Sequence, residues 1–302
     1  MIGVDIGTTS TKAVLYQETG EIISTNHQSY KLYSPDIHTA ELDLREILQA
    51  VVLVIKNVME TSQVDPNDIS FISFSSAMHS VIAIDKMGEP ITNCITWADN
   101  RSSDYAKIIH TQYDGNKIYQ KTGTPIHPMS PLSQIMWIEH EKPELARKTK
   151  KYIGIKEFIF HKSFQQYVVD YSIASCTDLM NLQTFTWDED ALKVAGISTI
   201  VSTQEVFTGC SSRYAKQMGI LPETKFVIGA SDGVLSNIGV NAIAEEEIAI
   251  TIGTSGAIRT VLPEPTVDPQ GRTFCYALTK DQWVVGGPIN NGRIVLQWVR
   301  DE

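Results

Sequence analysis

The sequence opens with Met1-Ile2-Gly3-Val4-Asp5-Ile6-Gly7-Thr8-Thr9-Ser10-Thr11-Lys12, and this stretch decides the fold. Apolar residues recur up to Gly7 and a second apolar run follows at 13–16, which predicts two strands joined by a tight turn of glycine and hydroxyl residues. Such a turn directs backbone N–H groups and hydroxyls into one small space, where an oxyanion such as phosphate can bind. Taken alone, the pattern also fits an ordinary surface turn.

The same pattern returns at 248–260, where an apolar strand leads into Ile252-Gly253-Thr254-Ser255 and a second strand follows. A duplicated fold explains both copies, because it places the two hairpins on opposite sides of one polyphosphate. The pair resembles the actin-like ATPase fold of sugar kinases, 70-kDa heat-shock chaperones and actin. We therefore expect an α/β protein with this duplicated, ribonuclease H-like fold.

Composition narrows the classes of partner. The 302 residues include 35 acidic and 25 basic side chains, which gives a net charge of −10. This charge disfavours nucleic acid and anionic membranes as partners, but it leaves small anionic ligands open. The four cysteines are far apart and form no metal-binding pattern, as is typical of reduced thiols in a cytoplasmic protein. The most apolar stretch, 47–58, is too short to cross a membrane.

The order of patterns along the chain suggests two domains. Strand patterns dominate the first hundred residues, helical patterns dominate about 101–224, and a buried strand at 226–229 precedes Asp232. We predict a complete N-terminal domain over 1–240, with a helical insertion at about 101–224, and the beginning of a C-terminal domain over 241–302. A duplicated fold needs a longer second half, so we expect a truncated chain that is inactive alone.

Five motifs stand in the order typical of the FGGY carbohydrate kinases, and the chain resembles that family over its whole length. The motifs are 5–10, 78–79, 97–101, 229–233 and 251–256. Within the family, 75–80 and 122–131 are most similar to members that act on gluconate. The resemblance implies ATP and Mg²⁺ as cofactors, a small sugar acid as substrate and a cytoplasmic location. It implies no nucleic acid or membrane partner, and it allows a homodimer.

Asp232 is the candidate catalytic residue. It follows a buried strand, where active-site residues of open α/β sheets commonly lie. Its carboxylate can accept the proton of a sugar hydroxyl that attacks the γ-phosphoryl group. An ordinary pKa of roughly 3.9 suffices, because the proton leaves late in a loose transition state. The same position also suits a helix N-cap. The resemblance favours the catalytic base, in contact with the substrate.

The resemblance also implies the position of the sugar site. It places Met78 and His79 there, with Trp97 stacked on the carbon chain of the sugar and Asp99 accepting hydrogen bonds from its hydroxyls. Core packing is the alternative for Trp97, and a structural salt bridge to Arg101 is the alternative for Asp99.

His127 is the candidate for reading the acid end of the substrate. It lies in Thr124-Pro125-Ile126-His127-Pro128, where two prolines stiffen the loop and can hold the imidazole in one place. We expect polar groups around His127 and His79 to receive the carboxylate, because burying an unpaired charge is costly. The alternative for His127 is an exposed side chain or a cap for the next helix.

The nucleotide is expected between the two hairpins, with Asp5 holding Mg²⁺ through water. The predicted contacts are Asp5, Gly7, Thr8, Thr9, Ser10, Lys12, Gly253, Thr254, Arg293 and Gln297. The family usually has a small residue in place of Arg293, so this arginine either clamps phosphate or obstructs it. The sequence has no HExxH, GxxxxGK[ST] or GxGxxG motif, which argues against a protein-held transition metal, a P-loop kinase and a nicotinamide dehydrogenase.

These features together predict an ATP-dependent kinase that converts D-gluconate to 6-phosphogluconate. A neutral ketose or polyol, such as xylulose, ribulose or glycerol, is the alternative substrate. A conformational ATPase related to actin or to chaperones is the alternative of another class. Such an ATPase needs no sugar pocket, so the residues Met78, His79 and Trp97 favour the kinase.

Overall fold

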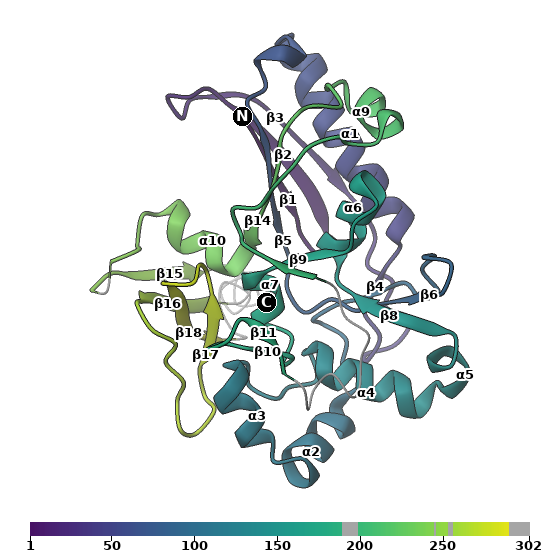
Figure 1. Ribbon diagram of the computed structural model, residues 1–302, viewed down its shortest axis with the longest axis vertical. Helices are drawn as coiled ribbons and strands as arrows, with labels where there is room; N and C mark the ends of the chain where they lie inside the picture. The colour runs from purple at the N-terminus through teal and green to yellow at the C-terminus, as the bar shows by residue number, and fades with distance from the viewer. Residues whose placement is uncertain (189–198, 245, 253–255, 290–302) are drawn as a thin grey trace, which may run out of the picture.

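The computed structural model describes residues 1–188, 199–244, 246–252 and 256–289, which form two sheets with helices around them (Figure 1). The larger sheet has six strands in the order β13-β14-β5-β1-β2-β3. These strands are β1 (Ile2–Ile6), β2 (Ser10–Tyr16), β3 (Ile22–Ser29), β5 (Ile72–Ser76), β13 (Val206–Phe207) and β14 (Phe226–Ser231).

The predicted opening hairpin is confirmed. β1 and β2 pair antiparallel from Ile2↔Leu15 to Ile6↔Thr11, and the N–H of Gly7 donates to the carbonyl of Ser10 (3.0 Å) to close the turn. β1 runs parallel to β5, and β5 runs parallel to β14. The carboxyl ends of these three strands therefore meet at one edge of the sheet, which is where ligands of open α/β sheets bind.

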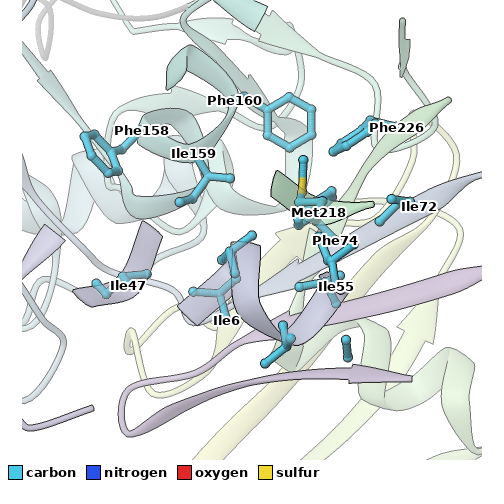
Figure 2. Close-up of a cluster of buried hydrophobic side chains, with 14 of the residues drawn as sticks. Ile6, Ile47, Ile55, Ile72, Phe74, Phe158, Ile159, Phe160, Met218 and Phe226 are labelled. Atoms are coloured by element: carbon cyan, nitrogen blue, oxygen red, sulfur yellow. The ribbon is translucent and has the colours of Figure 1, made fainter. Parts of the chain in front are cut away.

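A long helix covers one face of this sheet. Helix α1 (Leu44–Ser62) begins at Asp43, whose carboxylate accepts a hydrogen bond from the N–H of Arg45 (2.7 Å), as its N-cap position predicts. Its buried side packs against β1, β2 and β3. Figure 2 shows the core beneath, where Phe74 lies 5.5 Å from Phe160 and 5.6 Å from Phe226 between ring centroids. Close packing of this kind holds the strand ends rigidly.

The segment predicted as a helical insertion, 101–224, contains short strands as well as helices. Its strand β8 (Thr149–Ile153) pairs with β6 (Ile82–Asp85), and β13 forms an edge of the six-stranded sheet. The segment is therefore joined to the sheets, and the proposed domain boundaries stay a prediction. Its helices are α2 (Ser103–Gln112), α3 (Gly115–Thr122), α4 (Pro131–Glu141), α5 (Pro143–Ala146), α6 (Ile155–Phe164), α7 (Tyr171–Ser175) and α9 (Ser212–Met218).

Further short strands form separate two-stranded sheets. A 3-10 turn at Pro66–Asp68 precedes β5. In the described residues no helix is both long and apolar enough to cross a membrane. These sheets pair β4 (Glu41–Leu42) with β7 (Cys94–Ile95), β9 (Val168–Asp170) with β12 (Thr199–Val201), and β10 (Met180–Asn181) with β11 (Thr186–Trp187).

The second sheet contains the second hairpin. Its four antiparallel strands have the order β15-β16-β18-β17. Helix α10 (Asp232–Gly239) lies between the two sheets and contacts β14, β15 and β16 (Figure 1). The turn at 253–255 and a helix predicted from 292 lie outside the described residues. The strands are β15 (Ile248–Ile252), β16 (Gly256–Leu262), β17 (Phe274–Ala277) and β18 (Trp283–Ile289).

Candidate active site

A cavity of about 700 Å³ opens where the carboxyl ends of β1, β5 and β14 face the second sheet. Six of the predicted site residues line it, and all of them come from the first half of the fold or from α10. The second sheet supplies the opposite wall. The six are Thr8, Met78, His79, Trp97, His127 and Asp232, and the opposite wall includes Thr251, Arg259, Phe274 and Tyr276.

Asp232 is the first residue of α10, and its side chain reaches the solvent of the cavity. The helix N-cap is the preceding Ser231, whose hydroxyl accepts from the N–H of Val234 (3.4 Å), so the capping alternative does not describe Asp232. The surrounding protein reduces hydration and raises the pKa of Asp232 to about 6. The N–H of Gly233 opposes this shift by donating to the carboxylate (2.7 Å), and the charge of Asp5 adds to it.

A buried ion pair fixes the strand end that leads to this aspartate. The ammonium of Lys156 contacts the carboxylate of Asp170 and the carbonyl of Ala230, both at 2.9 Å. Ser172 donates to Asp170 (2.5 Å) and accepts from the N–H of Ser231 (2.8 Å). Both residues that precede the aspartate are therefore held by side chains from other elements. The sequence patterns did not predict this contact.

His79 connects the two sheets. It follows β5 in the left-handed backbone region (φ 58°), and its Nε2 lies 3.3 Å from the hydroxyl of Tyr276 on β17. Burial lowers the pKa of His79 to about 4, so the imidazole is neutral at pH 7. It can take part in a polar site as a neutral group, and it supplies no positive charge there.

Trp97 and His127 present polar hydrogens near the cavity. The indole N–H of Trp97 donates to the hydroxyl of Thr8 (2.8 Å), and the residue is 46% exposed, so core packing alone does not describe it. Nδ1 of His127 accepts from the N–H of Met129 (3.1 Å). That bond requires an unprotonated Nδ1, which leaves Nε2–H as the free donor of a neutral ring.

Asp99 does not occupy the predicted position. It is 1% exposed and does not line the cavity, so the predicted hydrogen bonds to sugar hydroxyls do not fit this geometry. Its carboxylate accepts from the N–H of Ala40 (2.9 Å) and pairs with Arg101 (2.8 Å), which also binds Glu41. The salt bridge to Arg101, the alternative that the sequence left open for Asp99, holds its carboxylate away from the cavity.

Some of the predicted nucleotide contacts lie in the described residues of the first hairpin, and the others lie outside the described residues. Asp5 and Lys12 are opposite one another in the first hairpin and line a neighbouring hollow of about 240 Å³. The N–H of Gly7 is used within the turn that also contains Thr9 and Ser10, so it is not a free donor for phosphate. The remaining predicted contacts lie outside the described residues: Gly253, Thr254, Arg293 and Gln297.

Sequence reasoning missed the polar groups of the opposite wall. Arg259, Arg272, Ser236 and Tyr276 all line the cavity. Only strand alternation offered a signal, because it places Arg259 on the same face of β16 as the buried Ala257. Which face meets the cavity depends on α10 and on the first sheet, and this is a long-range property.

Known proteins with similar sequences and structures identify the family of this chain. The FGGY family of carbohydrate kinases, N-terminal domain, matches residues 1–239. The gluconokinase of Bacillus subtilis (strain 168) is 59% identical over 307 residues, which cover 100% of this chain and 60% of that protein. The chain thus spans about 60% of the length of that relative.

Two solved structures from Lactobacillus acidophilus show the fold directly. One is described as a gluconate kinase and the other as a ligand-bound xylulose kinase; each has a TM-score of 0.95 and 38% identity. Each covers 99% of this chain and 61% of the solved chain. These matches confirm the predicted actin-like α/β fold. The aspartate at the start of α10 lies where the family motif places it in the sequence. With the match over 1–239, this chain belongs to the FGGY family of carbohydrate kinases.

Proposed function

We propose that the protein is an ATP-dependent kinase that phosphorylates the terminal hydroxyl of D-gluconate to give 6-phospho-D-gluconate. The observation that carries this proposal is the position of Asp232. It lies at the carboxyl end of a central strand, in the same cavity as Trp97 and His79. Similarity over the whole chain to the gluconokinase of Bacillus subtilis supports the choice of substrate.

Asp232 acts as the general base of the proposed reaction. The substrate hydroxyl donates its hydrogen bond to the carboxylate. As its oxygen bonds to the γ-phosphorus, the bond from that phosphorus to ADP breaks and the proton moves to the carboxylate. A pKa of about 6 suits this role better than an ordinary one, because the base is ionised at neutral pH and still binds the proton effectively. The bonds that hold Ala230 and Ser231 keep the carboxylate in position during the reaction.

The residues of the first hairpin suit a nucleotide with its metal. Bound MgATP supplies the γ-phosphoryl group and neutralises part of its charge. Asp5 lies near the carboxyl end of β1, and its charge adds to the raised pKa of Asp232. Lys12 lies opposite Asp5 and can contact phosphate as a point charge. We assign Mg²⁺ to Asp5 through water, and we place the reaction in the cytoplasm, where ATP and reduced thiols occur together.

Neutral groups of the cavity bind the carbon chain and hydroxyls of the sugar. The exposed face of Trp97 and the side chain of Met78 offer apolar contact, and Nε2–H of His127 offers a hydrogen bond. Neither His127 nor His79 carries a positive charge in this geometry. The predicted recognition of the acid end by these two histidines is therefore limited to neutral hydrogen bonds.

Xylulose is the second candidate substrate. The two Lactobacillus acidophilus structures share the same identity and TM-score with this chain, yet one is described as a xylulose kinase and the other as a gluconate kinase. A cavity with mostly neutral walls also accepts a neutral ketose. The charge of the substrate therefore separates the two candidates.

A panel of substrates tests the proposal. The full-length protein is assayed with MgATP and gluconate, xylulose, ribulose or glycerol, and kcat/KM is measured for each. We expect gluconate to exceed every neutral sugar by at least about tenfold, which corresponds to roughly 1.4 kcal/mol of transition-state binding. A higher value for xylulose would replace gluconate as the substrate, and no turnover with any sugar would exclude the kinase.

A further inference from the structure

Among the described residues two guanidinium groups line the cavity, and one of them is paired with an acid. Arg272 donates from Nε and Nη2 to both carboxylate oxygens of Asp268 (2.7 and 2.8 Å). Arg259 has no carboxylate within salt-bridge distance in the part of the chain that the structure describes. Its Nη1 donates to the hydroxyls of Thr251 (3.0 Å) and Ser236 (3.3 Å). Among the described residues, Arg259 therefore brings a guanidinium without a direct ion pair to the cavity that also contains Asp232.

The surroundings of Arg259 make this charge costly without an anion. The residue is half-buried, and its Nε is buried without a hydrogen-bond partner among the described residues. Burial lowers the pKa of Arg259, and the nearby charge of Asp232 opposes that shift without a direct ion pair. A guanidinium removed from water in this way is stabilised when an oxyanion enters and accepts its N–H groups.

Gly233 lets the side chains of Met78 and Arg259 lie close to the backbone beside Asp232. Gly233, next to Asp232, has no side chain, and a Cβ there would come within 3.7 Å of Nη2 of Arg259 and within 2.8 Å of Cε of Met78. The amide of Asn237 donates to the carbonyl of Arg259 (3.4 Å), which ties the strand to α10. The guanidinium is thus held beside the catalytic end of the cavity.

We propose that Arg259 is the oxyanion receptor of this cavity and makes it select an anionic ligand over a neutral one. The inference rests on the proposed function, and it identifies the group that supplies the charge that His79 and His127 lack. A planar guanidinium suits either of two oxyanions that enter here, the carboxylate of the sugar acid or the phosphoryl group in transfer. Both bring oxygen acceptors to the same nitrogen atoms.

Binding without turnover provides the first test. The full-length protein and the Arg259→Gln and Arg259→Lys variants are titrated calorimetrically with gluconate, with inorganic phosphate and with the neutral polyol sorbitol, in the absence of nucleotide. We expect Arg259→Gln to weaken the binding of gluconate or phosphate by at least tenfold and that of sorbitol by less than twofold. Arg259→Lys should recover part of the loss, because it restores the charge without the planar fork.

The same variants show whether Arg259 binds the carboxylate of the sugar acid or the phosphoryl group. If Arg259 binds the carboxylate, Arg259→Gln should weaken gluconate binding while kcat at saturating gluconate stays within threefold. If Arg259 binds the phosphoryl group, Arg259→Gln should leave gluconate binding intact, weaken phosphate binding and lower kcat with every sugar that is turned over. Arg213→Gln is the control for the loss of one surface charge, since this residue lies on the exposed side of α9. It should match the unmodified protein.

Equal losses for sorbitol and for both anions, or changes below twofold for all three ligands, would overturn the inference. Circular dichroism and Tm of each variant show whether a loss reflects unfolding, and rescue by lysine argues against a purely structural role. If the unmodified protein fails to phosphorylate gluconate, the proposed function falls. The phosphate titration still reports on Arg259 in that case, so the two failures are distinguishable.

Discussion

The two hairpins that share one motif have equal strand lengths and opposite surroundings. β1 and β15 have five residues each, and β2 and β16 have seven each. β1 lies inside the six-stranded sheet beneath α1, whereas β15 is an edge strand of the second sheet. Ile6 and Ile252 occupy the same place in the motif, yet Ile6 is 1% exposed and Ile252 is 71% exposed.

This difference separates what the motif determines from what its neighbours determine. The motif encodes two antiparallel strands in both places. Burial depends on the elements that pack on each face, and α1 covers only the first hairpin. The first sheet therefore provides a rigid core that holds the strand ends, and the second sheet provides one wall of the cavity. α10 joins them, with Asp232 at its start.

The largest expected effect comes from the junction between the two sheets. Asp232→Asn keeps the shape of the side chain but removes its ability to take a proton. In the full-length protein kcat should fall by roughly 10²–10⁴-fold, while KM for gluconate changes far less. Steady-state kinetics provide the measurement. Asp104→Asn on the exposed side of α2 is the matched control. A kcat within a few-fold of the unmodified enzyme would show that the base lies elsewhere.

The pH dependence of kcat sharpens the same prediction. A base must be unprotonated to act, and the pKa of Asp232 is about 6 in the folded protein. The rate should therefore be constant above about pH 7 and fall as the pH drops through 6. The acidic limb should disappear in Asp232→Asn. A limb centred near pH 4 would indicate a base that is fully hydrated.

The matched isoleucines test the comparison itself. Ile6→Ala removes buried methyl groups from the first sheet and should lower the free energy of unfolding by about 2–5 kcal/mol. Ile252→Ala removes exposed groups at the equivalent place and should change it by less than about 0.5 kcal/mol. Denaturant unfolding of the 302-residue chain measures both. Equal losses would mean that Ile252 is covered in solution.

Local patterns predicted the parts of this fold that local chemistry determines. The first hairpin and the strand that precedes Asp232 follow from alternation and turn residues. Asp99 differs from the predicted sugar contact because a salt bridge to Arg101 already satisfies its carboxylate. The sequence offered this pairing as the alternative but did not decide between it and a sugar contact.

The missed residues depend on long-range geometry. Arg259 faces the cavity because α10 packs against β16, and Lys156 reaches Ala230 across 74 positions of sequence. Strand periodicity assigns such residues to a face but does not say what the face meets. The sequence thus predicted one side of the site, which its motifs carry, and left the other side undetermined.

Contact between the two sheets makes His79 a pH-sensitive position. Its pKa is about 4 in the folded protein and roughly 6.5 in an unfolded chain, so the unfolded chain binds more protons between these values. The contribution of His79 to stability is fully present above pH 6.5 and is lost as the pH falls toward 4. The loss should approach about 3 kcal/mol at the acid end.

His79→Asn removes this titration and provides the comparison. Asp178, whose pKa burial raises well above its usual value, contributes with the opposite sign, but it does so in both proteins. The difference in unfolding free energy between the two proteins, measured from pH 7 to pH 4.5, isolates the histidine. A difference that is independent of pH would show that His79 is hydrated and that the contact with Tyr276 is open in solution.

The smallest expected effect concerns the outer face of the second hairpin. Ile250 and Ile258 are cross-strand neighbours, and both are exposed. Replacing both by threonine keeps the β-branched shape that suits a strand, so the unfolding free energy should change by less than about 0.5 kcal/mol per site. The exposed apolar area falls, so binding of a hydrophobic dye and self-association in sedimentation velocity should both decrease. Replacing Ile2 and Val4 of β1, which are buried beside α1, by threonine should instead unfold much of the protein. If the outer pair proves as sensitive as the inner one, a further part of the protein covers this face, and the contrast between the two hairpins disappears.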